Sequence, residues 1–265
     1  MTTNAVETAA TFQQRMDAVE AFIMHHVTDS HVLALPFVSV PLPKFLTAHG
    51  VMVALAALFL ILLFRVFYRH EAAVPRGITN LLEVFVLFIR DQIVVPYLGR
   101  EDGRRMTPLF CSFFFFILMM NLVGLVPCFQ SATANLSVTA ALGFVSLGFM
   151  IFGAMYRTGP VAFLKGFVPH GVPWPILIML VPIEFISVFV RAFALMIRLF
   201  ANELAGHMVI FFMLGLVIIF GWVALPFFAL AVLIYIMEIG IAFLQAYIFT
   251  LLSAVFIGER YHPEH

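Results

Sequence analysis

Hydrophobic positions along this chain form long uninterrupted runs instead of the alternating pattern of a soluble domain. Residues 46–64, 108–129 and 132–156 contain no Asp, Glu, Lys or Arg. About 20 apolar residues in a helix suffice to cross the hydrocarbon core of a bilayer. We therefore predict three membrane-spanning helices in the first part of the chain.

Two longer apolar runs follow and predict two long helices joined by a short turn. They cover residues 172–213 and about 226–257, and the residues between them include Gly221 and Pro226. At ~1.5 Å per residue the two helices measure roughly 60 and 48 Å, against about 30 Å for the hydrocarbon core. Strong tilt or a break is required, so we expect a tilted helical hairpin.

The segment between the first two spans is amphipathic at residues 79–95 and predicts an interfacial helix. Seven arginines lie between residues 65 and 105, which places this segment in the cytoplasm by the positive-inside rule. The predicted fold is an all-α integral membrane protein with about five crossings, its N-terminus outside and its C-terminus cytoplasmic. We divide it into residues 1–45 (an extracytoplasmic lead that lacks signal-peptide features), 46–107 (first span and basic segment), 108–171 (second and third spans) and 172–265 (hairpin).

Composition supports a membrane protein and excludes several kinds of chemistry. The 265 residues are 63% hydrophobic and 11% charged, so we expect a lipid environment. The zero formal net charge says little about partners because the charges are segregated along the chain, and we expect no nucleic-acid partner. Cys111 and Cys128 lie at opposite ends of one span, and we interpret both as packing residues. Glu203 and His207 are four apart but have no third ligand cluster, and nucleotide-binding and nucleophile motifs are absent from the sequence. We expect no metal, no cofactor and no catalytic site.

Arg198 is the residue that most needs a function, because a guanidinium inside an apolar run stays charged wherever the fold puts it. Glu184, Arg191 and Arg198 are seven apart, and Asn202 is four beyond Arg198, so they share a broad helix face. His207 is expected near that face, and Glu203, about 140° away, is expected to point elsewhere.

On the last helix, Glu238 and Gln245 are also seven apart. We expect the facing surfaces of the hairpin to hold Glu184, Arg198, Asn202 and His207 on one arm and Glu238 and Gln245 on the other. Alternative interpretations are a buried ion pair of Arg198 that fixes helix register, and hydrogen bonds that merely join the helices, including one from Asn121 in the second span. Titratable groups along a membrane element are more typical of a proton route.

Several motifs resemble subunit a of F-type ATP synthases over nearly the whole chain beyond Pro36. The most specific is residues 196–207, which read MIRLFANELAGH. Further matches are Pro182-Ile183-Glu184, Asn121-Leu122 with Pro127, ANLS at 134–137 and LQAYIF at 244–249. At Gly124 the chain departs from members of this family that carry an acid there.

The resemblance implies a stator subunit, and the long N-terminal lead without a targeting peptide favours a bacterial inner membrane. Its tilted hairpin would lie against a rotating c-ring, with peripheral-stalk b subunits as further partners. Two offset half-channels would meet the ring at the level of Arg198, and in the family an acid and a histidine at the positions of His207 and Glu238 can trade places. The implied function is proton conduction coupled to ATP synthesis, with sodium as the alternative ion. Asn121, His207, Glu238 and Gln245 would line the outer half-channel and Glu184 the inner one.

Two rival functions belong to other classes. A secondary transporter usually shows inverted repeats and helices broken at mid-membrane, and neither pattern is present in the sequence. A purely structural assembly subunit would not need Arg198, His207 and Glu238 on one hairpin.

Overall fold

The computed structural model describes residues 13–14, 16–17, 19, 21, 32–34, 39–43, 47–67, 77–126, 129–168 and 173–261. Nearly all of them are helical, apart from loops and a ribbon of two short antiparallel strands, β1 (Val32–Ala34) and β2 (Ser39–Pro41). The predicted all-α fold is confirmed. Most of the predicted N-terminal lead, together with Pro127 and Cys128, lies outside the described residues.

Five helical stretches in the described part of the chain are long and apolar enough to cross a membrane, which matches the predicted number. They are α2 (Ala48–Phe67); α3 (Ile78–Phe88) with the π-helix η1 (Ile89–Val94) and α4 (Val95–Gly124); α5 (Leu136–Gly148) with the π-helix η3 (Phe149–Gly153) and α6 (Ala154–Thr158); α8 (Trp174–Phe220); and α9 (Leu225–Tyr261). The shorter elements are η2 (Ala132–Ala134), α7 (Pro160–Lys165) and η4 (Gly221–Ala224).

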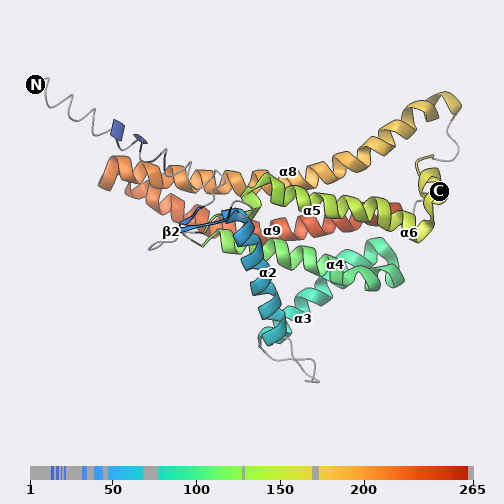
Figure 1. The fold of residues 1–265 in the computed structure, drawn as a ribbon, viewed down its shortest axis with the longest axis horizontal. Coiled ribbons are helices and arrows are strands. Elements are labelled where there is room, and N and C mark those ends of the chain that lie inside the picture. Colours follow the sequence, from blue (N-terminus) through green and yellow to red (C-terminus); the bar gives the residue numbers. More distant parts are fainter. Residues whose placement is uncertain are drawn as a thin grey trace, which may run out of the picture.

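The last two helices form the predicted hairpin. Helix α8 has 47 residues and α9 has 37, or roughly 70 and 55 Å at 1.5 Å per residue. Gly221, with φ 59°, ends α8 in a backbone conformation that favours glycine, and η4 completes the turn. In Figure 1, α8 and α9 run side by side and across the direction of α2. With 20 residues, α2 has the length that crosses a bilayer along the membrane normal. With α2 in that orientation, both long helices are strongly tilted from the membrane normal.

The second crossing differs from its predicted bounds of 108–129. The backbone at Gly99 is non-helical, with φ 77° and ψ 173°, so the chain folds back there and brings Gly103 against Val95. The helix after this turn thus begins well before Pro108, and the exposed pair Glu101 and Arg105 stabilises its charged first turns at 3.0 Å. It ends at Gly124, five residues earlier than predicted. A helix was correctly predicted at 79–95, where α3 and η1 form the arm that precedes the turn.

The third crossing begins four residues later than the predicted Ala132. The reason is a helix cap, because the side chain of Asn135 accepts a hydrogen bond from the backbone N–H of Ser137 at 2.8 Å. The preceding residues form the short 3-10 turn η2 instead of α-helix. This turn and the residue before it carry two buried hydroxyl groups, that of Thr133 directed to α4 and that of Ser131 directed to α8.

Helix α4 occupies the centre of the bundle, packed against α2 on one side and α9 on the other. Its phenylalanine run supplies edge-to-face ring contacts in both directions, Phe115 with Phe64 of α2 at 5.2 Å and Phe113 with Phe249 of α9 at 5.5 Å. Helix α8 packs on α5 and α9 and leaves much of its own surface open. Within the described part of the chain, α8 is therefore packed on one side and largely exposed on the other.

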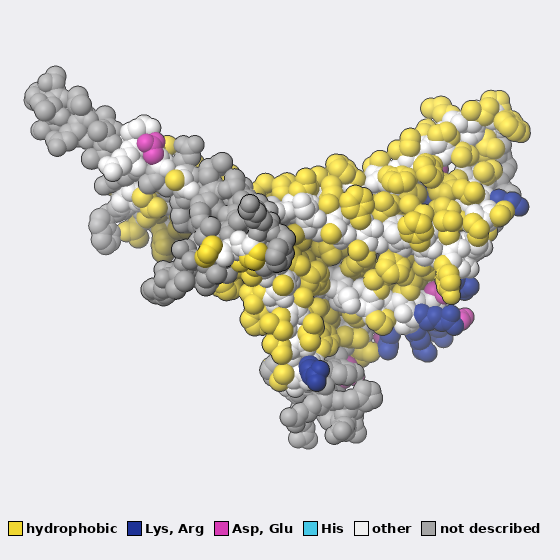
Figure 2. Space-filling model, viewed as in Figure 1, with side chains coloured by type: hydrophobic (Ala, Val, Ile, Leu, Met, Phe, Trp, Pro, Cys, Tyr) yellow, Lys and Arg dark blue, Asp and Glu magenta, His cyan; other side chains and the backbone are white. Residues whose placement is uncertain are grey.

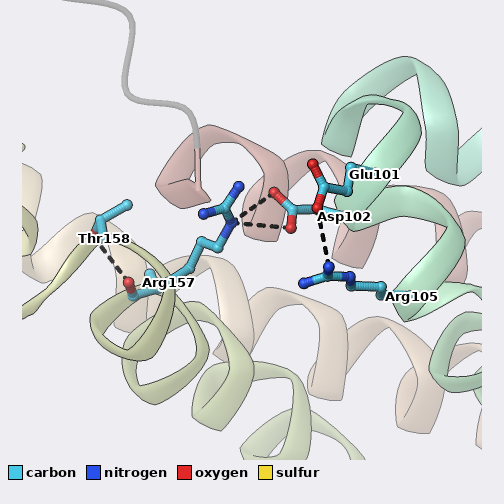
Figure 3. Close-up of polar contacts among 6 residues, drawn as sticks. Glu101, Asp102, Arg105, Arg157 and Thr158 are labelled. Carbon is cyan, nitrogen blue, oxygen red and sulfur yellow. Dashed lines mark hydrogen bonds and ion pairs between the residues drawn. The ribbon is translucent and has the colours of Figure 1, made fainter.

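Most of the charged side chains seen in Figure 2 lie toward its right-hand end, and apolar side chains cover much of the rest of the described surface. Arg157, after η3, forms an ion pair at 2.9 Å with Asp102, which follows the Gly99 turn (Figure 3). Asp102 is buried and Arg157 is half exposed. The pair fastens the end of the third crossing to the start of the second.

Candidate functional site

A chain of polar side chains joins α4, the η2 turn and α8 inside the bundle. Thr133 Oγ1 donates to Oδ1 of Asn121 at 2.8 Å and lies 3.2 Å from the hydroxyl of Ser131. Ser131 Oγ donates to Oε1 of Glu203 at 2.5 Å, and the same carboxylate oxygen lies 3.2 Å from Nε2 of His207. Asn121, Ser131 and Thr133 are buried, and the side chains of Glu203 and His207 are 13% and 14% exposed.

A close approach of backbone segments makes this network possible. A Cβ atom at Gly124 would lie 2.7 Å from Oγ of Ser131, so any side chain there would displace the segment that leads into η2. The absence of an acid at Gly124, noted from the sequence, thus has a steric consequence. It lets the hydroxyl of Ser131 reach Glu203 on α8.

Glu238 lies beside this network on the opposite arm of the hairpin. Its side chain is buried, and within the described part of the chain its Oε2 atom has no hydrogen-bond partner. Its Oε1 atom occupies space left free by the missing side chain of Gly206, since a Cβ at that position would overlap it. A cavity of about 250 Å³ lies at this contact, lined by Asn121, Asn202, Glu203 and Glu238 among others.

Arg198 lies on the open side of α8, and the expectation that it faces α9 is wrong. Its side chain is exposed, and among the described residues its guanidinium has no hydrogen bond or ion pair. Ala194, Ala201 and Ala205, which lie on the same side of α8, are exposed as well. Heptad spacing groups residues on one face but does not tell which neighbour that face meets.

His207 was also expected near the face of Arg198, and this is wrong for a simpler reason. Nine residues at about 100° each amount to two and a half turns, which puts His207 on the far side of α8. There it contacts Glu203, only about 40° away on the helix, at 3.2 Å. Glu203 points away from Arg198, as predicted. Its side chain is part of the polar network, although it was not among the predicted site residues.

Glu184 is brought into an ion-paired cluster far from the cavity. Its carboxylate accepts from Nη2 of Arg260 at 2.5 Å, and Arg260 stacks over the ring of Phe167. One heptad further along α8, Arg191 pairs with Glu259 of α9. Two ion pairs therefore join the end of α9 to α8, one with its acid on α8 and the other with its acid on α9. The second pair gives Arg191 a partner, which the sequence pattern had not supplied.

The structure brings Asn121, Asn202 and Glu238 to one cavity and places His207 next to it through Glu203. Gln245 is buried on α9, two turns of helix beyond Glu238. Arg198 lies outside the cavity and Glu184 lies at the other end of the hairpin. Among the described residues no group of three or more His, Cys, Asp or Glu side chains could hold a metal ion.

Fold and site together define a multi-pass helical membrane protein with a tilted hairpin. Acidic side chains lie on the packed side of this hairpin, and an arginine is exposed on its other side. Residues 50–258 match the family described as ATP synthase A chain. The chain is 39% identical to an ATP synthase subunit a of Anaeromyxobacter dehalogenans, covering 91% of this chain and 70% of the relative. It is 40% identical to the subunits a of Myxococcus xanthus (83% and 76% covered) and Chloroherpeton thalassium (95% and 79%). The chain belongs to the ATP synthase subunit a family.

Proposed function

We propose that this chain is the proton-conducting stator subunit of a rotary ATP synthase and that the open face of α8 lies against the c-ring. The observation that carries the proposal is Arg198, a permanent cation exposed on an apolar helix without a partner among the described residues. Such a group is costly in a membrane unless something outside the chain uses it. A rotor carboxylate is a partner of suitable charge.

The surroundings of Arg198 support a close approach by neighbouring helices. Ala194, Ala201 and Ala205, which lie one or two turns of α8 from the arginine, are all exposed. Small residues let helix backbones approach closely inside a bilayer. A guanidinium at that contact would favour the ionised form of each rotor acid, so that the acid releases its proton. It would also block direct flow between the two sides of the membrane.

Two half-channels would then serve the ring from opposite sides. The outer one is proposed to use Asn121, Asn202, His207, Glu238 and Gln245, four of which line or adjoin the cavity between α4, α8 and α9. The inner one is proposed to use Glu184, near the end of α9. Each proton that falls through ~100 mV releases about 2.3 kcal/mol, so several must pass for each ATP made.

Orientation, organisation and partners follow from the same proposal. The arginine-rich segment 65–105 favours a cytoplasmic position, which puts the N-terminus outside and the C-terminus inside a bacterial inner membrane. The parts 1–45, 46–107, 108–171 and 172–265 would act as lead, basic anchor, core spans and ring-facing hairpin. Peripheral-stalk b subunits would hold the chain still, and ATP chemistry would take place in other subunits.

The function is tested by ATP-driven acidification of inverted membrane vesicles that carry this chain in its complex. The expected result is acidification at the same rate with and without sodium. ATP-driven uptake of sodium into the vesicles, with acidification suppressed when sodium is added, would identify sodium as the ion. The chain reconstituted alone should move no solute, whereas a secondary transporter, which the family match does not support, would act unaided.

Cysteine substitutions test the two half-channels separately, in a background without Cys111 and Cys128. Cysteines at Asn121 and Gln245 should react with small water-soluble thiol reagents added from the outer side. A cysteine at Glu184 should react from the inner side. Inertness at all three positions would contradict aqueous half-channels.

A further inference from the structure

Glu203 is a buried acid to which the proposed half-channels assign no role. Its side chain is 13% exposed in the middle of a membrane helix, where an acid is costly and by default marks a functional site. We propose that Glu203 is a proton-relay residue of the outer half-channel, which passes protons between the hydroxyl network of η2 and the pair His207 and Glu238. The inference rests on the proposed proton conduction.

The position of one oxygen atom supports this role. Oε1 of Glu203 accepts from Ser131 at 2.5 Å and lies 3.2 Å from Nε2 of His207. The hydroxyl of Ser131 lies 3.2 Å from that of Thr133, which donates its own proton to Asn121 of α4. Hydroxyl and amide groups stay neutral near pH 7, whereas a carboxylate can hold a proton. Glu203 is therefore the residue at which this network can take up a proton before His207.

The cavity supplies the connection to Glu238. Both carboxylates line the same space of about 250 Å³, whereas a water molecule occupies ~30 Å³ in the liquid. Water in this space can bridge the two acids without direct contact between them. Gly206 helps, because its missing side chain leaves room for Oε1 of Glu238.

The transfer steps balance as follows for a proton moving inward. The Glu203 carboxylate takes up a proton and becomes the neutral acid. Its O–H bond then breaks as an N–H bond forms at Nε2 of neutral His207, which leaves a carboxylate beside an imidazolium. The imidazolium next releases a proton, and the Glu238 carboxylate on the facing helix accepts it. His207 is neutral again, and Glu203 is ready for the next proton.

A simpler role is that Glu203 only fastens η2 to α8 through Ser131. The two roles differ in what a glutamine would do at this position. The side-chain oxygen of glutamine still accepts from Ser131, so Glu203→Gln keeps the fastening and removes the proton site. Glu203→Asp keeps a titratable group on a shorter side chain.

The experiment compares complexes carrying Glu203→Gln, Glu203→Asp and the control Glu101→Gln, whose carboxylate is exposed far from the cavity. Acidification of inverted vesicles is measured per mole of assembled complex over a range of pH, together with passive proton conductance. Among the described residues, the titratable groups that interact with Glu203 are His207 on its own helix and Glu238 on α9. Both remain in all three variants.

We expect Glu203→Gln to lower pumping and passive conductance by roughly tenfold, the scale of losing one charged hydrogen-bond partner, and to change the pH profile. Glu203→Asp should recover part of the rate, and Glu101→Gln should match the wild type. Wild-type rate and pH profile in Glu203→Gln would overturn the relay, as would equal losses in Gln and Asp with an unchanged profile. Failure of the wild-type vesicles to acidify would instead overturn the proposed function.

Discussion

Arg198 and His207 lie on opposite sides of α8, although only nine residues separate them. Arg198 is exposed on the open face, and His207 contacts Glu203 in the interior of the bundle. The helix itself therefore separates the fixed cation from the buried acid and imidazole groups. In the proposed mechanism a proton must pass around or along α8 to reach the ring, so the cavity between α8 and α9 becomes the place to perturb.

Replacing Gly206 by alanine should displace the Glu238 carboxylate, because the new Cβ would overlap Oε1. The side chain can rotate away, so the fold should survive while proton transfer slows. We expect normal amounts of complex and pumping lowered by several-fold, measured as vesicle acidification.

Gly240→Ala on α9 is the matched control, since a Cβ there meets no side chain or neighbouring segment within 4 Å among the described residues. Gly258→Ala offers the opposite case, because its Cβ would lie 2.5 Å from the backbone carbonyl oxygen of Tyr97, and we expect less assembled complex. Unchanged pumping in Gly206→Ala would argue that the position of Glu238 is unimportant.

Exchange of His207 and Glu238 tests whether the two residues act as one unit. His207→Glu alone brings a third carboxylate to Glu203 and Glu238 in a low-dielectric site, so activity should fall strongly. Adding Glu238→His should restore part of it. The double-mutant cycle of pumping rates should show coupling of about 1 kcal/mol or more, whereas additive losses would show that the residues act independently.

The sequence predicted the helices well because apolar runs and arginine clusters report membrane crossings directly. It placed the ends less well where local chemistry decides them. Asn135 caps α5, which therefore begins four residues after the start of the apolar run, and Gly99 turns the chain inside a charged segment. These are single-residue effects that hydrophobic periodicity does not contain.

The sequence indicated several residues of the candidate site correctly, but it did not predict how they are arranged. Asn121, Asn202 and Glu238 do meet at one cavity. The contact of Glu203 with Ser131, however, joins residues 72 positions apart and depends on the close approach at Gly124. Helix angles alone could have placed His207 with Glu203, but the approach of η2 could not be read from the sequence.

Charge exchange between Arg191 and Glu259 should show what fastens the end of α9. The pair is partly exposed, at 28% and 48% of the two side chains, so each single reversal should cost the complex roughly 1 kcal/mol. The double reversal, Arg191→Glu with Glu259→Arg, should recover most of the loss. Thermal dissociation of the purified complex measures these changes in stability. Equal stability of the wild type, the two single reversals and the double reversal would contradict the role of this ion pair.

Asp102→Asn should weaken assembly without a direct effect on proton transfer. It removes the ion pair that joins Arg157 to the turn after Gly99 (Figure 3) and leaves a buried amide in its place. We expect less complex in the membrane but normal pumping per mole of complex. Glu101→Gln, one residue away and exposed, should leave both quantities unchanged. A specific loss of pumping in Asp102→Asn would instead indicate that this end of α4 takes part in proton transfer.

The most direct measurement is ATP-driven acidification by complexes that carry Arg198→Ala, with passive proton conductance recorded on the same vesicles. Arg198 makes no hydrogen bond or ion pair among the described residues, so its removal should leave the complex assembled. We expect pumping to be abolished and passive conductance to be retained or raised. Pumping at a near-normal rate would contradict a role of Arg198 in proton transfer to the ring, and loss of the assembled complex would show that Arg198 holds the structure together instead.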